Sequence, residues 1–132
     1  MGTIQTMVER NKVMTDYLAG PMRGIPFFNF PAFDEARDKL RALGHEVISP
    51  ADIDRENGFD AMLLPEDTDW NVIPPQLNLD ALIERDLAAV RRCHFVVTLP
   101  GWQHSVGARA EVAVAQWAGK SIMSIEDFSS NL

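Results

Sequence analysis

The stretch that most constrains the fold is a short apolar run followed at once by a helix of small residues. Residues 95–99, FVVTL, precede the breaker Pro100-Gly101 and then residues 105–118, SVGARAEVAVAQWA. This order predicts a buried strand, a tight loop and a helix. Small residues at the helix start allow close packing on a sheet, and they let backbone N–H groups approach a ligand.

One carboxylate, Glu111, lies a turn inside this predicted helix. Its neighbours three and four positions away are all small or apolar: Gly107, Ala108, Val114 and Ala115. Glu111 therefore lies on the face that should be buried. A lone buried carboxylate is costly unless it is neutralised, paired or used. Glu111 is a candidate catalytic residue, and the alternative is an ion pair with Arg23 or Arg109.

Strands and helices alternate along the rest of the chain. Apolar runs bounded by turn residues predict strands at 13–19, 46–49, 93–99 and 120–125. Apolar residues at helical spacing predict three main helices at 29–43, 78–90 and 105–118. This alternation predicts an α/β domain with an open, doubly wound parallel sheet of the flavodoxin or Rossmann kind.

We expect a single domain over residues 12–126, with a flexible lead-in at 1–11 and a tail at 127–132. Residues 51–77 are acidic and lack clear periodicity, apart from a possible helical turn around 59–64. Because a long irregular segment in a small domain is usually functional, we interpret it as an insertion that forms a lid or an oligomer contact.

Composition excludes several classes of function. The net charge of −7 argues against a nucleic-acid partner, which requires a cationic surface. No apolar run approaches the roughly 18 residues of a membrane span, and the first 11 residues lack a signal-peptide core. With Cys93 as the single cysteine, we expect a reducing, cytoplasmic location.

Metal and cofactor sites are not expected. The pair Cys93-His94 opens a strand without a partner motif, so it lacks metal-ligand spacing. His45 follows a helix end and is interpreted as a surface residue. His104 precedes the helix of small residues, where it either contacts a ligand or is solvated.

Two loops at the carboxyl ends of predicted strands form a candidate ligand site. In open α/β sheets, ligands bind outside these ends. One loop, residues 20–24, supplies Arg23, and the other, residues 100–107, supplies Ser105 and a helix N-terminus. Together they suit an anion such as a 5′-phosphate. The first loop taken alone is equally compatible with a purely structural turn.

A second carboxylate, Asp86, also falls within an apolar helical stripe, near Leu82, Ile83 and Val90. Two carboxylates in different environments can divide the roles of nucleophile and acid, as in cleavage of glycosidic bonds. The alternative for Asp86 is a buried salt bridge or a cap. The aromatic residues after the first loop, Phe27, Phe28 and Phe30, either stack a base or staple the following helix start.

Three motifs resemble the nucleoside 2-deoxyribosyltransferase superfamily. They are residues 17–24, YLAGPMRG, residues 83–87, IERDL, and residues 105–111, SVGARAE. The resemblance covers most of residues 13–125. Within the superfamily, the chain is most similar to nucleoside 5′-monophosphate N-glycosidases and to short phage and prophage proteins of unassigned role. It implies the same α/β fold, a nucleoside or nucleotide ligand, no cofactor, and a homodimer or larger homo-oligomer.

The resemblance also implies roles for individual residues. Glu111 would attack C1′ of the sugar to give a glycosyl-enzyme, Asp86 would assist or position the leaving base, and Tyr17 would orient Glu111 or the sugar. The residues expected to bind substrate, including a 5′-phosphate, are Gly20, Met22, Arg23, Gly24, Ser105 and Gly107. The nucleotide hydrolases often carry Gly-Ser where this chain has Gly20-Pro21.

The expected function is therefore hydrolysis or base exchange at the N-glycosidic bond of a (deoxy)nucleoside or its 5′-monophosphate. One alternative is a catalytically silent nucleotide-binding module for regulation or sensing. Another is a structural interaction protein that binds no small ligand. Two carboxylates beside an anion site favour the enzyme, because a binding module has little use for them.

Overall fold

Four parallel strands form the centre of the computed structural model, which describes residues 13–129 of the chain. They are β1 (Thr15–Ala19), β2 (Glu46–Ile48), β3 (Phe95–Thr98) and β4 (Ser121–Ser124). Their order in the sheet is β2-β1-β3-β4, with all three neighbouring pairs parallel. The expected open, parallel α/β sheet of the Rossmann kind is confirmed. The predicted lead-in and residues 130–132 lie outside the described residues.

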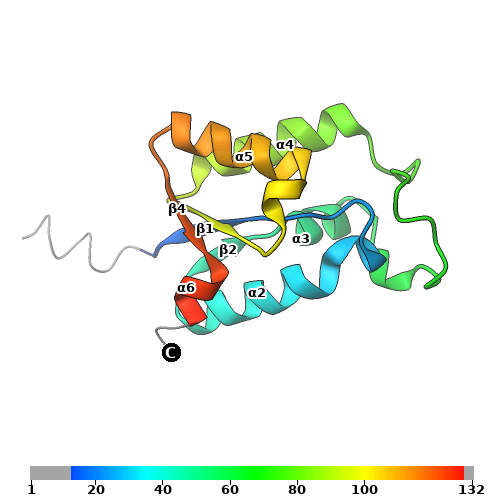
Figure 1. Cartoon of the computed structure of the whole chain (residues 1–132), viewed down its shortest axis with the longest axis horizontal. Helices are drawn as coiled ribbons and strands as arrows, with labels where there is room; N and C mark the ends of the chain where they lie inside the picture. Colours follow the sequence, from blue (N-terminus) through cyan, green and yellow to red (C-terminus); the bar gives the residue numbers. More distant parts are fainter. Residues whose placement is uncertain (1–12, 130–132) are drawn as a thin grey trace, which may run out of the picture.

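Helices cover both faces of this sheet (Figure 1). One face carries α4 (Leu79–Arg92) and α5 (Val106–Trp117), and the other carries α2 (Phe30–Ala42) and α6 (Ile125–Ser129). A short helix, α3 (Pro50–Glu56), follows β2. Three 3-10 turns complete the described part: η1 (Pro26–Asn29), η2 (Ala61–Leu63) and η3 (Trp102–His104). The three expected main helices are α2, α4 and α5.

The central strand β1 contributes to two separate cores, because successive side chains of a strand point to opposite faces. Leu18 packs in the core beneath α2, together with Phe30 and Phe33. Tyr17 and Ala19 pack in the core beneath α4 and α5. All three β1 side chains are fully buried. This alternation places the single tyrosine of the chain directly under the helix that carries Glu111.

Residues 51–77 begin with regular structure that the sequence analysis did not predict. The strand predicted at 46–49 ends at Ile48, and Pro50 is the first residue of α3. The Ser49 side chain accepts a hydrogen bond from the Ala51 N–H at 3.3 Å, and Pro50 has no N–H to satisfy, so the helix start is well capped. At the other end of the chain, α6 extends into the predicted tail.

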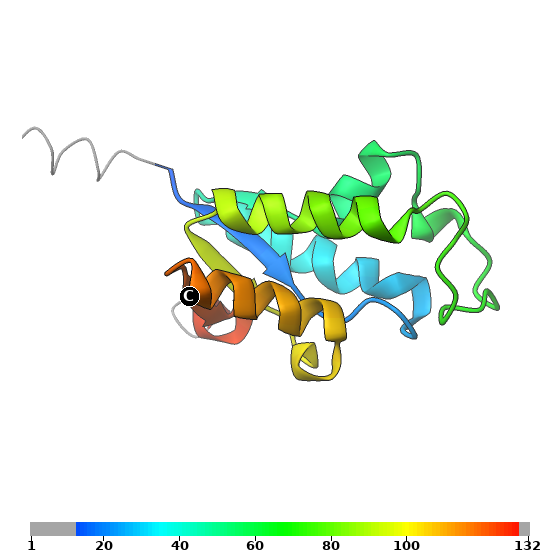
Figure 2. The ribbon, with the colours of Figure 1, turned by 90° about the horizontal axis from the view of Figure 1, so that it is seen from above.

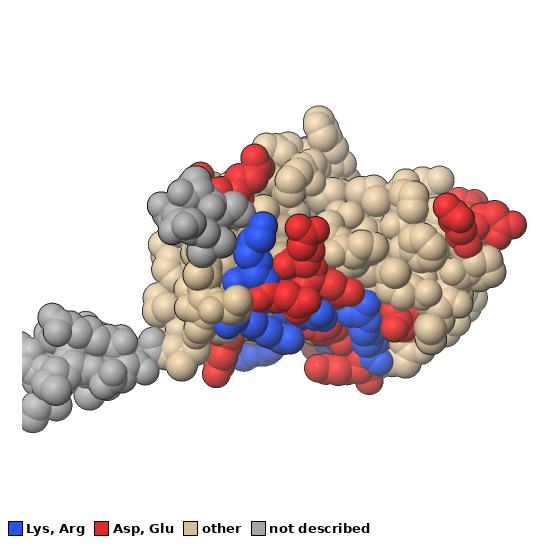
Figure 3. Space-filling model, turned by 90° about the horizontal axis from the view of Figure 1, so that it is seen from below, with Lys and Arg blue, Asp and Glu red and all other residues tan. Residues whose placement is uncertain are grey.

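Charged side chains of both signs are intermixed on the face that α2 forms (Figure 3). Asp34, Arg37, Asp52 and Arg55 form ion pairs there with N–O distances between 2.7 and 3.2 Å. This face therefore presents no extended basic surface. Among the described helices, none combines the length and the apolar character needed to cross a membrane.

Candidate functional site

A cavity of about 700 Å³ lies at the carboxyl ends of the strands, beside the N-terminal halves of α4 and α5. Figure 2 shows these two helices running side by side over the sheet with their first turns at the same end. The cavity brings together most of the residues expected to form the site: Gly20, Met22, Arg23, Asp86, Ser105, Gly107 and Glu111. Two expected residues do not line it. Gly24 donates its N–H to the Trp70 carbonyl at 2.7 Å, and Tyr17 lies behind Glu111.

Glu111 is held in place by Tyr17. The Tyr17 phenol, which is fully buried, donates a hydrogen bond to Oε2 of Glu111. Glu111 itself is 9% exposed and faces the cavity. The pKa of Glu111 is raised to about 8: burial is the largest cause, the Tyr17 hydrogen bond opposes the shift, and the charge of Asp86 adds to it. No ion pair joins Glu111 to a basic side chain within residues 13–129, so the expected alternative of an arginine partner is not observed.

Asp86 lies on the cavity side of α4. Its Oδ1 is buried and has no hydrogen-bond partner among the described residues. Burial raises the pKa of Asp86 to about 6, and the neighbouring guanidinium of Arg85 limits the shift. Among the residues that the structure describes, Asp86 forms no salt bridge either. The lower pKa of Asp86 makes it the carboxyl that carries negative charge at neutral pH, whereas Glu111 is largely protonated.

A third carboxylate, Asp54, was missed by the sequence analysis. It belongs to α3, is 6% exposed and lines the same cavity. Burial raises the pKa of Asp54 to about 7, Asp86 adds to the increase, and Arg85 and Arg55 oppose it. A helix of 7 residues is too short for a periodic apolar pattern. The signal that could have revealed it is the Ser49-Pro50 pair, a typical helix start.

An anion-binding corner lies at the first turn of α5. Ser105 is the N-cap, and its side chain accepts a hydrogen bond from the Ala108 N–H at 3.2 Å. The hydroxyl can still donate its own proton, and the N–H groups of the first turn are free of helical partners. Arg23, an exposed residue, lines the same cavity. The cavity lining thus includes a cation, a hydroxyl and a helix N-terminus, the kinds of group that bind phosphate.

Gly20 at the end of β1 allows a close approach between two segments of the site. A Cβ atom built on Gly20 would lie 2.8 Å from Cβ of Leu99 at the end of β3. Any side chain at position 20 would therefore push the two loops apart. The glycine of the YLAGPMRG motif has a packing role beneath the cavity, beyond its expected contact with substrate.

Three consecutive residues of η1 adopt left-handed backbone conformations, with φ of 57° at Phe27, 49° at Phe28 and 62° at Asn29. This conformation is costly for residues other than glycine and is found mostly where function requires it. Asn29 holds the turn by donating its side-chain N–H to the Pro21 carbonyl at 2.9 Å. Phe27 and Phe28 both pack on Trp70, with ring centroids 5.0 and 5.2 Å apart.

The turn places Phe28 in the lining of the cavity, whereas Phe30 lies in the core beneath α2. Ile73, Pro74 and Leu77 form the facing apolar wall. These three residues belong to the expected insertion at 51–77. The segment thus supplies both an apolar wall and, through Asp54, an acidic group.

The histidines differ in their burial and in their contacts. His45, expected at the surface, is partly buried: its Nδ1 lies 2.6 Å from Oδ2 of Asp16, and its side chain is 20% exposed. Asp16 itself is fully buried. His94 accepts a hydrogen bond from the Thr15 N–H at 3.0 Å. His104 is exposed and lines the cavity. In the described part of the chain, no three His, Cys, Asp or Glu side chains converge to hold a metal.

The comparisons with known proteins agree with this architecture. Residues 14–124 match the family model "Domain of unknown function (DUF4406)", and the chain belongs to this family. Among solved structures, the chain is similar to a 2-deoxyribosyltransferase from the psychrotolerant bacterium Bacillus psychrosaccharolyticus. The TM-score is 0.54 at 22% identity, and the match covers 83% of this chain and 70% of the other. The expected resemblance is thus confirmed at the level of the fold. No curated protein matches the chain.

Proposed function

We propose that this protein cleaves the N-glycosidic bond of a (deoxy)nucleoside or a (deoxy)nucleoside 5′-monophosphate, by hydrolysis or by base exchange. The observation that carries the proposal is the buried pair Tyr17–Glu111 facing a cavity that also holds Asp86. A carboxylate oriented by a buried phenol is suited to attack a sugar carbon, as in retaining glycosidases. The similar 2-deoxyribosyltransferase fold provides independent support.

In the proposed mechanism, Oε1 or Oε2 of Glu111 attacks C1′ of the sugar and displaces the base. Burial raises the pKa of Glu111 and so favours its protonated form. The positive charge that develops on the sugar favours the carboxylate form instead. Asp86, negative at neutral pH, stabilises the same charge. Water or a second base then releases the sugar from Glu111. Hydrolysis and transfer differ only in which of these acceptors reacts.

The anion-binding corner supports recognition of a 5′-phosphate. Arg23, Ser105 and the first turn of α5 line the cavity that Glu111 also lines, so they would bind the phosphate while Glu111 contacts the sugar. Asp86, the carboxyl that carries negative charge at neutral pH, repels a phosphate placed beside it. The 5′ end of a substrate therefore belongs at this corner.

The experiment that tests the proposal is base release. The protein is incubated with nucleosides and 5′-monophosphates of the common bases, as ribo- and deoxyribo-compounds, with and without a free acceptor base. Chromatography measures released and exchanged base, and calorimetry on the same panel measures binding. Release above the uncatalysed rate supports the enzyme. Binding without release would contradict it and favour the silent nucleotide-binding module.

We also propose that the protein functions as a homo-oligomer. Large apolar side chains are exposed on the outer helical layer: Ile83 on α4 is 48% exposed, and Val106 and Trp117 on α5 are 75% and 90% exposed. Apolar side chains gathered on one layer are typical of surfaces that bind another protein. Light scattering of the purified protein tests this, and a monomer at micromolar concentration would contradict it.

A further inference from the structure

The cavity contains one carboxylate more than the proposed nucleophile and its charged partner require. Asp54 is 6% exposed and lines the cavity, and no hydrogen bond or ion pair joins its side chain to another group among residues 13–129. Unlike Oδ1 of Asp86, its carboxylate oxygens are not among the fully buried unpartnered atoms of this region, so they are open to the cavity. The Asp54 carboxyl is therefore placed to contact a bound ligand.

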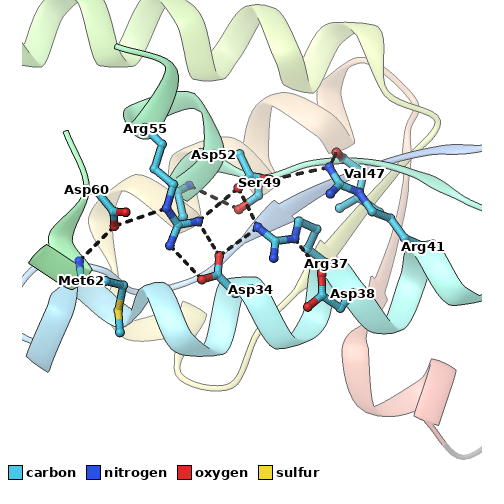
Figure 4. A network of polar contacts seen from close by, with 11 residues as sticks. Asp34, Arg37, Asp38, Arg41, Val47, Ser49, Asp52, Arg55, Asp60 and Met62 are labelled. Carbon is cyan, nitrogen blue, oxygen red and sulfur yellow. Dashed lines mark hydrogen bonds and ion pairs between the residues drawn. The ribbon is translucent and has the colours of Figure 1, made fainter. Parts of the chain in front are cut away.

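The helix that carries Asp54 is rigidly held. The neighbouring residue, Arg55, binds both carboxylate oxygens of Asp34 on α2, at 2.7 and 2.8 Å. Its guanidinium also stacks over the Phe30 ring at 4.9 Å. Figure 4 shows Arg55 reaching from α3 into this network on α2. A short helix anchored in this way keeps the Asp54 side chain directed at the cavity.

The surroundings of Asp54 suit a planar ring. Pro50, Phe28 and Phe59 line the cavity with it, and the Phe59 N–H donates to the Asp54 carbonyl at 2.9 Å. Aromatic faces stack on nucleobases, whereas sugars and phosphates require polar groups. Asp54 therefore lies at the edge of the wall where a base would bind.

Charged groups on the neighbouring elements control the proton on Asp54. Asp86 on α4 favours the protonated form, and Arg85 on α4 and Arg55 on α3 oppose it. The pair Tyr17–Glu111, from β1 and α5, also lies in this region, and the charged or titratable side chains of Arg23 and His104 line the same cavity. Burial raises the pKa of Asp54 to about 7, a value suited to a general acid near neutral pH.

We propose that Asp54 is the general acid that protonates the departing base, while Asp86 remains ionised beside the sugar. This assignment rests on the proposed function. As Glu111 forms its bond to C1′, the C1′–N bond breaks and its electron pair passes to the base. The proton of Asp54 moves to a ring nitrogen of the base, which leaves neutral. In the second half of the reaction, the Asp54 carboxylate takes a proton from the attacking water, so both groups are regenerated.

The test uses substrates whose base leaves without a proton. Methylation of guanosine at N7, or of cytidine at N3, gives the base a positive charge before cleavage. We measure kcat/KM for the wild type, for Asp54→Asn and for the control Glu56→Gln. Each protein is tested on methylated substrates and on the matching unmethylated substrates. The substrates are nucleosides and 5′-monophosphates, in ribo and deoxyribo form. Glu56 is exposed on the same helix and does not line the cavity.

Asp54→Asn should lose about 100-fold or more on unmethylated substrates and less than about 5-fold on methylated ones. It should also abolish the fall of kcat/KM at high pH that the wild type shows on unmethylated substrates. An equal loss on both partners, or a fall at high pH that persists in the variant, would overturn the assignment. A wild type that cleaves only methylated substrates would overturn it and leave the proposed function intact. A wild type that releases base from no substrate would overturn both.

Discussion

Tyr17 and Glu111 meet at the bottom of the cavity, the phenol from the central strand donating to the carboxyl from the helix above it. Because the hydrogen bond lowers the pKa of Glu111, it opposes the burial that raises this pKa to about 8. The contact therefore holds the side chain in one orientation and increases the fraction in the carboxylate form. Both effects are expected of a residue that prepares a nucleophile.

Tyr17→Phe should therefore reduce activity through Glu111. The substitution keeps the ring in the core and removes the donor, so the pKa of Glu111 should rise and the rising limb of kcat/KM should move to higher pH. We expect a loss of roughly 10-fold or more at pH 7. A pH–rate profile of the variant measures this. An unchanged rising limb would show that the hydrogen bond does not tune Glu111.

The cavity carboxyls should also make stability depend on pH. The pKa of Glu111 is near 4.5 in an exposed setting and about 8 in the fold. Its contribution to the free energy of unfolding is therefore present at low pH and is lost as the pH rises toward 8. Glu111→Gln, which stays neutral, should gain stability over the wild type at pH 8, with a melting temperature higher by roughly 5 °C.

Thermal unfolding at pH 5 and pH 8 measures this difference. Glu84→Gln is the matched control, because Glu84 is exposed on α4 and does not line the cavity. The melting temperature of the control should differ little from that of the wild type at either pH. A Glu111→Gln variant that is equally destabilised at both values of pH would contradict the buried, protonated state of Glu111.

Arg23→Ala tests the anion-binding corner. Loss of the guanidinium should lower kcat/KM for 5′-monophosphates by roughly 10- to 100-fold and leave nucleosides nearly unchanged. Steady-state kinetics on matched pairs measures the selectivity. Arg109→Ala is the control, since Arg109 is exposed on α5 and does not line the cavity. Equal losses on both members of a pair would remove the phosphate assignment.

The left-handed turn at residues 27–29 should be sensitive to its third residue. Asn29→Ala loses the hydrogen bond to Pro21 and keeps a Cβ in an unfavourable conformation, so the free energy of unfolding should fall by about 1–3 kcal/mol. Asn29→Gly loses the same bond and relieves the strain, so it should cost less. Urea denaturation measures the free energy of unfolding of both variants. An alanine variant as stable as the glycine variant would show that the left-handed backbone at residue 29 is not strained.

The sequence was sufficient to predict the parallel sheet, its three main helices and two of the three cavity carboxylates. Those predictions depended on patterns that extend over several turns or a whole strand, as around Glu111 and Asp86. Such patterns reflect burial on one face of an element, which the sequence records directly.

The remaining features depend on contacts between distant segments. Asp54 lies on a helix too short to show periodicity, and residues of α4 and Phe28 line the same cavity. His45 contacts the buried Asp16, and this contact exists only in the folded sheet. The left-handed backbone at Phe27 is stabilised by Trp70, far along the chain. Local sequence contains none of this information.

The nucleophilic role of Glu111 is tested by the rate of base release by Glu111→Gln on the best substrate of the panel, beside the wild type and Glu84→Gln. The amide keeps the shape of the side chain and removes the nucleophile. We expect a loss of roughly 100-fold or more for Glu111→Gln, with the control unchanged. Full activity in Glu111→Gln would contradict the assignment of Glu111 as the nucleophile.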